Sequence, residues 1–198
     1  MTWRTHVAGG MASLWLLRPL LLETRVFGGA PLDWTNLGVL ALVAGLGALL
    51  PDLDAAESKA KHLVFSFRLG GERIHVAPLS FPALVLSSTL THRGPLHSLL
   101  GFVAVGVLIG MPLALVVSWT AAVALLLGWA SHLALDACTK SGLPLLWPNL
   151  RRIRFLPPIL RVTTGSDAES LVFALLASLS LALLLSALPG ALSGNGFR

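Results

Sequence analysis

The sequence predicts an all-α, polytopic integral membrane helical bundle: one domain over residues 1–198, with about five transmembrane helices and a metal site at its cytosolic rim. Three observations support this class. Hydrophobic residues make up 55% of the chain and charged residues only 12%, whereas soluble domains carry roughly 25% charged residues. The apolar residues gather in runs long enough to cross a bilayer, which takes about 20 of them. Histidine and aspartate residues stand at the ends of those runs.

Three predicted spans are single apolar runs. The first, Thr5–Leu22, is interrupted by Arg18, and the second, Trp34–Pro51, contains no charged residue. The last, Leu171–Leu188, stops at Pro189-Gly190. Each run approaches the length that a helix needs to cross the hydrocarbon core.

The longest apolar block predicts a helical hairpin. Gly94–Leu135 is a stretch of 42 residues without Asp, Glu, Lys or Arg, which is too long for one crossing and long enough for two. Because Gly and Pro interrupt local structure most strongly, we expect the turn at Gly110-Met111-Pro112. The two spans of the hairpin would then cover residues 95–110 and 113–136.

A further apolar segment, Val76–Leu90, is harder to assign. It has 15 residues, with Pro78 and Pro82 near its start, so it is short for a crossing and is better interpreted as interfacial or re-entrant. Five spans is therefore the predicted number, with four or six as alternatives.

With five spans, the candidate metal ligands all emerge on one face of the membrane. Eleven basic residues are predicted on that face and only Arg25 and Arg198 on the other. The eleven are Arg4, Lys59, Lys61, Arg68, Arg73, Arg93, Lys140, Arg151, Arg152, Arg154 and Arg161. Because basic loops stay in the cytoplasm, we expect a multi-pass protein of the plasma (inner) membrane with the N-terminus and the site on the cytoplasmic face. The net charge of +5 then reports topology, and we expect no nucleic-acid partner.

Two histidine-containing motifs carry the metal prediction. His132 and Asp136 are four residues apart, so they share one face of a helix, and Asp136 could bind a metal or orient the imidazole. His92 and His97 flank Arg93-Gly94-Pro95 and could converge on one ion. A helix-end hydrogen bond or an ordinary structural histidine is the alternative in each case.

The remaining candidates stand beside other span ends. Asp52 and Asp54 close the second span, where carboxylates are costly unless they are paired or metal-bound. Asp54 could instead cap a following helix with Glu57, as Glu169 could cap the last span after Ser166. His6 begins the first span and is ambiguous.

The seven candidate ligands are therefore His6, Asp52, Asp54, His92, His97, His132 and Asp136. Imidazole and carboxylate without thiolate favour zinc, with manganese or iron as alternatives, in one or two ions. The single cysteine, Cys138, excludes a multi-thiolate site and an internal disulfide. The stretch Ala137–Ala168 is long for a loop, and its arginines could either contact lipid phosphates or only set topology.

Taken together, these motifs resemble the YdjM-type family of LexA-regulated, metal-dependent hydrolases of the inner membrane. The resemblance covers roughly residues 5–170. The matching pieces are Thr5-His6 with Gly9-Gly10, Leu50-Pro51-Asp52-Leu53-Asp54, His92-Arg93-Gly94 with His97-Ser98, Ser131-His132-Leu133-Ala134-Leu135-Asp136 with Thr139, Leu146-Trp147-Pro148, and Thr164-Gly165-Ser166 with Glu169. Ala55 and Leu96 depart from the family pattern.

The resemblance implies a hydrolase that uses a metal-activated water, for which a lipid or lipid-linked phosphoester at head-group depth is the expected substrate. In that hypothesis Asp54 is a ligand or base, Arg93 stabilises developing oxyanion charge, and Asp136 is a ligand or orients one. A non-catalytic scaffold or sensor that the metal stabilises is an alternative. A metal transporter is less favoured, because transport sites usually lie near the bilayer midplane. The oligomeric state is not predicted.

Overall fold

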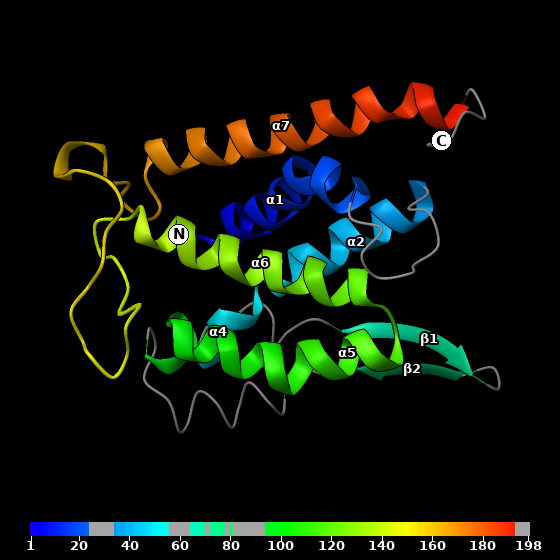
Figure 1. Ribbon diagram of the computed structural model, residues 1–198, viewed down its shortest axis with the longest axis horizontal. Coiled ribbons are helices and arrows are strands. Elements are labelled where there is room, and N and C mark those ends of the chain that lie inside the picture. The colour runs from blue at the N-terminus through cyan, green and yellow to red at the C-terminus, as the bar shows by residue number, and fades with distance from the viewer. Residues whose placement is uncertain (24–33, 56–63, 70–71, 78–79, 81–93, 193–198) are drawn as a thin grey trace.

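A computed structural model describes residues 1–23, 34–55, 64–69, 72–77, 80 and 94–192 of the chain. Long helices dominate it, as predicted (Figure 1). They are α1 (Trp3–Glu23), α2 (Trp34–Gly47), the run of α4 (Leu99–Val105), η5 (Gly106–Gly110) and α5 (Met111–Val116), α6 (Trp119–Ala137), and α7 (Asp167–Leu192). Short 3-10 turns η2 (Leu50–Asp54), η4 (Pro95–His97) and η6 (Pro158–Leu160) connect them.

Among the described residues, four helical segments are long and apolar enough to cross a membrane: Leu37–Asp54, Leu99–Val116, Trp119–Ala137 and Asp167–Ser186. The fifth helix, α1, is 21 residues long but carries Arg4, His6 and Arg18, and it does not reach the same hydropathy. It packs against α2, α6 and α7 and lies between α6 and α7 in Figure 1. The prediction of an all-α polytopic bundle is confirmed.

The predicted turn at Gly110-Met111-Pro112 is wrong. The helix continues through that position to Val116, and the chain turns at Val117 and Ser118 instead. Pro112 cannot donate the usual backbone hydrogen bond, and the preceding turn is widened into a π-helix, in which Met111 N–H donates to Gly106 O. Ser118 then begins α6, its Oγ accepting a hydrogen bond from Ala121 N at 3.2 Å.

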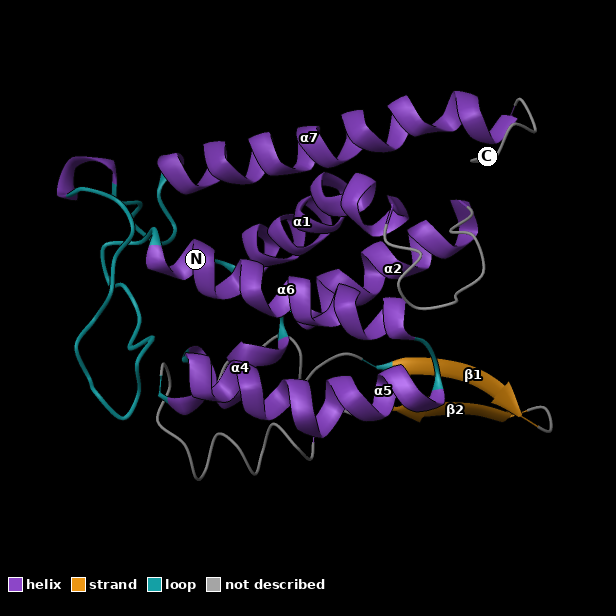
Figure 2. Cartoon of the chain, in the orientation of Figure 1, coloured by secondary structure: helices purple, strands orange, loops and turns teal. Residues whose placement is uncertain are grey.

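An antiparallel hairpin of β1 (Phe65–Leu69) and β2 (Glu72–Val76), drawn in orange in Figure 2, was not predicted. Figure 1 places it near the end of α5, at the end of the bundle away from the C-terminus of α6. Arg68 and Arg73 therefore do not belong with the basic residues expected beside the site. Lys59, Lys61 and Arg93, also expected there, lie outside the described residues, as do Arg25 and Arg198. Of the predicted interfacial segment Val76–Leu90, residues 78–79 and 81–90 lie outside the described residues.

Close helix packing holds α2 and α6 together. A Cβ added to Gly128 of α6 would lie 1.9 Å from the carbonyl oxygen of Ala44 in α2, whereas one added to Gly38 would meet nothing within 4 Å. Small residues that let backbones approach in this way are typical of helix contacts in membranes. One apolar cluster, around Leu14, Leu37 and Ala44, fills the half of the bundle away from the predicted metal ligands. Another, around Leu53, Trp129 and Leu133, lies beside those ligands.

Candidate metal centre

The structure brings six of the seven predicted ligands to one end of the bundle. The first turns of α1 supply His6, η2 supplies Asp52 and Asp54, η4 supplies His97, and the last turns of α6 supply His132 and Asp136. The seventh candidate, His92, lies outside the described residues, as do Arg93 and the predicted capping partner Glu57.

His132 is held in one tautomer by the backbone. Its Nδ1 lies 2.7 Å from the carbonyl oxygen of Ala48, which can only accept a hydrogen bond, so Nδ1 carries the proton and Nε2 presents its lone pair. This arrangement is the usual support for a metal-binding imidazole. The side chain is fully buried. No sequence motif marks a supporting backbone carbonyl, so this partner could not have been predicted.

The Nε2 atom of His132 is one corner of a triangle of three donor atoms. It lies 3.3 Å from His97 Nε2 and 3.7 Å from Asp52 Oδ1, and those two atoms are 3.4 Å apart. Bonds of about 2.1 Å in a tetrahedral zinc site put neighbouring ligand atoms about 3.4 Å apart. The three atoms are thus spaced as one face of such a site. All three distances between them are longer than those of ordinary charged hydrogen bonds.

Asp54 supports the triangle from behind. Its Oδ2 lies 3.5 Å from His97 Nδ1, the ring nitrogen on the other side from Asp52 and His132. Both residues are buried. Asp54 therefore orients the imidazole through the nitrogen that does not face the triangle. Carboxylates often orient metal-binding histidines in this way, without binding the metal themselves.

Asp52 and Asp54 also set the charge of His97. Burial alone would lower the pKa of His97, but the hydrogen-bonding carboxylates of Asp52 and Asp54 outweigh it and raise that pKa to about 9. Without a metal, the ring is therefore protonated near neutral pH. The two carboxylates thus favour a positive charge on the His97 ring.

His6 and Asp136 form a second layer. The ring of His6 stacks on that of His132 with centroids 3.7 Å apart, and its Nε2 lies 3.4 Å from Asp136 Oδ1. Asp136 also accepts a hydrogen bond from the α-amino group of Met1. His6 is buried, yet neither ring nitrogen makes a hydrogen bond to a described residue. Such a buried polar group needs an explanation, and a metal ion bound by His6 would be one.

The six side chains divide by exposure. His6, Asp54, His97, His132 and Asp136 are all buried, and only Asp52, with 22% of its side chain exposed, reaches the surface. Asp52 is therefore the one of these six residues whose side chain is accessible from outside.

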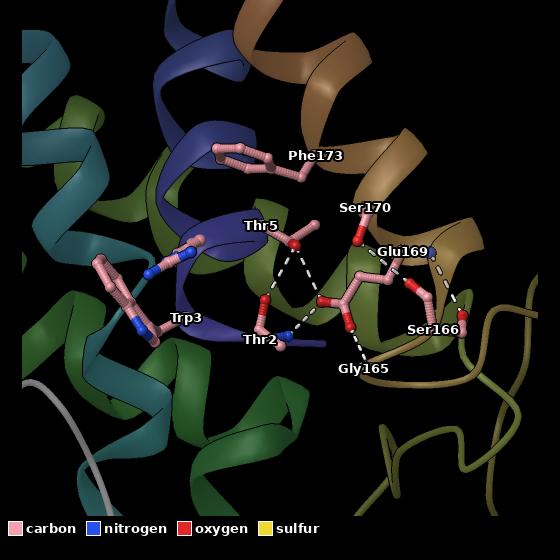
Figure 3. A pocket seen from close by; sticks show the side chains of 9 residues that line it. Thr2, Trp3, Thr5, Gly165, Ser166, Glu169, Ser170 and Phe173 are labelled. Carbon is pink, nitrogen blue, oxygen red and sulfur yellow. Dashed lines mark hydrogen bonds between the residues drawn. The ribbon is translucent and has the colours of Figure 1, made fainter.

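Glu169 does more than the predicted helix capping. Ser166 Oγ accepts a hydrogen bond from Glu169 N at 3.4 Å, which fits a cap. The carboxylate itself binds Gly165 N at 2.6 Å, Thr5 Oγ1 at 2.9 Å and the backbone N–H of Thr2 (Figure 3). Glu169 thereby ties α7 to the turn of α1 that carries His6. Nothing in the sequence indicated this long-range contact.

A cavity of about 350 Å³ borders the same two helix ends. Trp3, Arg4, Ser170 and Phe173 contribute to its walls, and Figure 3 shows it beside Glu169. None of the six clustered ligand candidates lines it. The cavity is therefore separate from the triangle of donor atoms.

Comparisons with known proteins agree with the architecture. The family described as YdjM inner membrane protein matches residues 1–191. An uncharacterized protein, YvsG of Bacillus subtilis (strain 168), is 33% identical over 176 residues, which are 88% of this chain and 88% of the relative.

The inner membrane protein YdjM of Escherichia coli (strain K12) is 30% identical over 142 residues, which are 71% of this chain and 62% of that protein. The YdjM protein of Shigella flexneri matches to the same extent. No solved structure matches the chain. Because the family match covers almost the whole sequence, the chain belongs to the family of the YdjM inner membrane protein.

Proposed function

We propose that this protein is a membrane-bound, metal-dependent hydrolase that cleaves a phosphoester of a lipid or lipid-linked substrate at the cytosolic membrane surface. The observation that carries the proposal is the triangle of His97 Nε2, His132 Nε2 and Asp52 Oδ1, whose sides are 3.3 to 3.7 Å. Two imidazoles and a carboxylate with no thiolate suit zinc best, with manganese or iron as alternatives.

The proposal assigns one ion to the centre. His132 belongs to the triangle and to both of the other groups of side chains that could hold a metal, which are His6 with Asp52 and His132, and His97 with His132 and Asp136. Because its Nδ1 is committed to Ala48 O, His132 offers only Nε2, and one nitrogen lone pair binds one ion. His6 and Asp136 are then the candidates for a further ligand or for a proton acceptor.

A zinc ion in such a site would make its bound water nucleophilic near neutral pH and polarise a phosphoryl oxygen. The protein's own contribution would be orientation. Asp54 and the Ala48 carbonyl fix the two imidazoles, and Asp52 lies where substrate enters. From the sequence, Arg93 would stabilise developing oxyanion charge and His92 would be a further ligand.

The cytoplasmic placement of the site is part of the proposal. The basic residues described at the end of the bundle that holds the site support it through the bias of basic loops toward the cytoplasm. They are Arg4, Lys140, Arg151, Arg152, Arg154 and Arg161. The relatives named as inner membrane proteins support the compartment.

The test is metal content and turnover on the same purified protein. Wild-type protein is compared with His97→Ala and with His75→Ala, which changes an exposed histidine in β2 outside the cluster. We expect about one zinc per chain and metal-dependent hydrolysis of a phospholipid or phosphoester in wild type and His75→Ala, and neither in His97→Ala. Metal-dependent hydrolysis that survives in folded His97→Ala would contradict the assignment.

One observation favours a second candidate, a scaffold or sensor that the metal only stabilises. Five of the six clustered side chains are buried, as in structural metal sites with closed coordination. In that case the protein would bind zinc and melt at a lower temperature without it, but would hydrolyse no member of a phosphoester panel. Metal uptake into proteoliposomes would instead support the transporter hypothesis.

A further inference from the structure

The loop between α6 and α7, residues 138–166, has an unusual charge pattern. It contains Lys140, Arg151, Arg152, Arg154 and Arg161 and no acidic residue. Within it, Arg151, Arg152 and Arg154 are exposed. The loop connects two candidate membrane spans at the site end of the bundle (Figure 2). A loop between two spanning helices would lie at the level of the lipid head groups.

The loop has a fixed conformation in which its arginines are braced by its own backbone. Leu143 pairs with Ile153 and Thr139 with Val162 as isolated β-bridges. Arg154 Nε donates to Lys140 O at 2.9 Å.

Arg161 is held in the same way, its Nε donating to Leu156 O at 2.9 Å. Each guanidinium has five N–H donors, so most remain for an anionic ligand. A loop that only set topology would need the charges but not this bracing.

Large apolar side chains are exposed among these cations. Ile159 is 91% exposed, Leu150 73%, Leu160 61% and Phe155 58%. Exposed apolar groups beside Lys and Arg are typical of segments that lie in a membrane interface, where the apolar groups enter the acyl boundary and the cations bind anionic head groups. From the sequence, lipid contact and topology are equal alternatives for these arginines, and the exposed apolar side chains favour lipid contact.

We infer that residues 146–161 form a membrane-surface contact that binds anionic phospholipid, with Leu150, Phe155, Ile159 and Leu160 inserted and Arg151, Arg152 and Arg154 on the phosphates. The partner is the bilayer rather than a protein, because the loop is tethered at both ends to helices that cross it. The inference does not depend on the metal centre. Loss of zinc binding would leave this contact intact, and loss of this contact would leave zinc content unchanged.

The test places a reporter at the most exposed apolar position. In full-length protein with Cys138→Ser, which removes the single cysteine, Ile159→Cys is labelled with a nitroxide. The protein is reconstituted in nanodiscs of phosphatidylcholine alone or of phosphatidylcholine mixed with phosphatidylglycerol. Leu175→Cys on α7, which is 61% exposed on a candidate span, is the matched control for a position already in lipid.

We expect the label at position 159 to be accessible to oxygen and shielded from an aqueous quencher in phosphatidylglycerol discs, and less so in phosphatidylcholine alone. Control labels at 175 should be lipid-exposed in both.

Changing Arg151, Arg152 or Arg154 to Gln should weaken insertion about fivefold per residue. Leu160→Ser, which keeps every charge, should also weaken insertion. A label equally exposed to water in both lipids would overturn the inference. So would shielding that follows protein concentration instead of lipid charge, since that result would identify a second copy of the chain as the partner.

Discussion

The two ends of this bundle are built on different principles. Around Leu14, Leu37 and Ala44 the described helices form a cluster of buried apolar side chains. At the other end, six histidine and aspartate side chains meet, five of them buried. Burying ionisable groups is expensive unless they are paired or bind a cation. We therefore expect the apolar cluster to stabilise the fold and the polar cluster to bind the ion. Mutations at the apolar end should lower the free energy of unfolding, and mutations at the polar end should lower zinc affinity.

The largest expected effect is at the centre of the triangle. His132→Ala removes the one donor that both candidate metal groups share, so zinc affinity should fall by more than about a hundredfold. Isothermal titration calorimetry of the folded, detergent-solubilised protein measures this zinc affinity. If this variant does not fold, His132→Asn, which keeps a polar side chain, provides the measurement. Zinc binding at wild-type affinity by either folded variant would remove the distinction between the two ends.

The opposite result is expected at the apolar end. Leu14→Ala opens a cavity in the cluster of Leu14, Leu37 and Ala44, where Leu14 is 1% exposed, and should reduce the free energy of unfolding by about 2 to 5 kcal/mol. Zinc content per folded chain should not change. Leu16→Ala on the same helix is the control. Because Leu16 is 55% exposed, its truncation leaves no cavity. Equal destabilisation by the two changes would show that this end is not tightly packed.

A smaller effect separates ligands from supporting residues within the polar end. Asp54→Asn keeps the shape of the side chain and loses the charge behind His97 Nδ1, so zinc affinity should fall about 10- to 100-fold while one ion still binds. The control is Asp167→Asn, which changes an exposed carboxylate at the start of α7. Complete loss of zinc in Asp54→Asn would make Asp54 a direct ligand and would reopen a second ion position.

How far the sequence predicts this architecture also differs between regions. Charge-free runs predict the helices of both ends, because a bilayer demands long apolar segments, and the spacing of His132 and Asp136 predicts that they share a helix face. The turn near Pro112 was misplaced because a π-helix accommodates the proline without breaking the helix. The β-hairpin had a signal, since Phe65, Phe67 and Leu69 alternate with polar residues before Gly70-Gly71.

The supporting contacts of the centre were not predictable. Ala48 acts through its carbonyl oxygen, which every residue possesses, and Thr5 meets Glu169 only because α1 and α7 are neighbours in space. Contacts of this kind depend on how helices pack, and the sequence pattern specifies which face of a helix is apolar without specifying which helix covers it.

The smallest effect concerns the proton that competes with zinc at the polar end. The pKa of His97, opposed by burial but raised to about 9 by the hydrogen-bonding carboxylates of Asp52 and Asp54, exceeds the ordinary histidine value of about 6.5. In metal-free protein the protonated ring therefore stabilises the fold fully below about pH 6.5, and that contribution is lost as the pH rises through about 9. Zinc requires the neutral ring, so its affinity has the opposite dependence, rising about tenfold per pH unit up to that pKa. Calorimetry in buffers of different ionisation enthalpy should detect about one proton released per zinc near neutral pH in wild type and in His75→Ala. Binding without proton release would mean that His97 is already neutral in the metal-free protein, and that Asp52 and Asp54 do not hold a cation there.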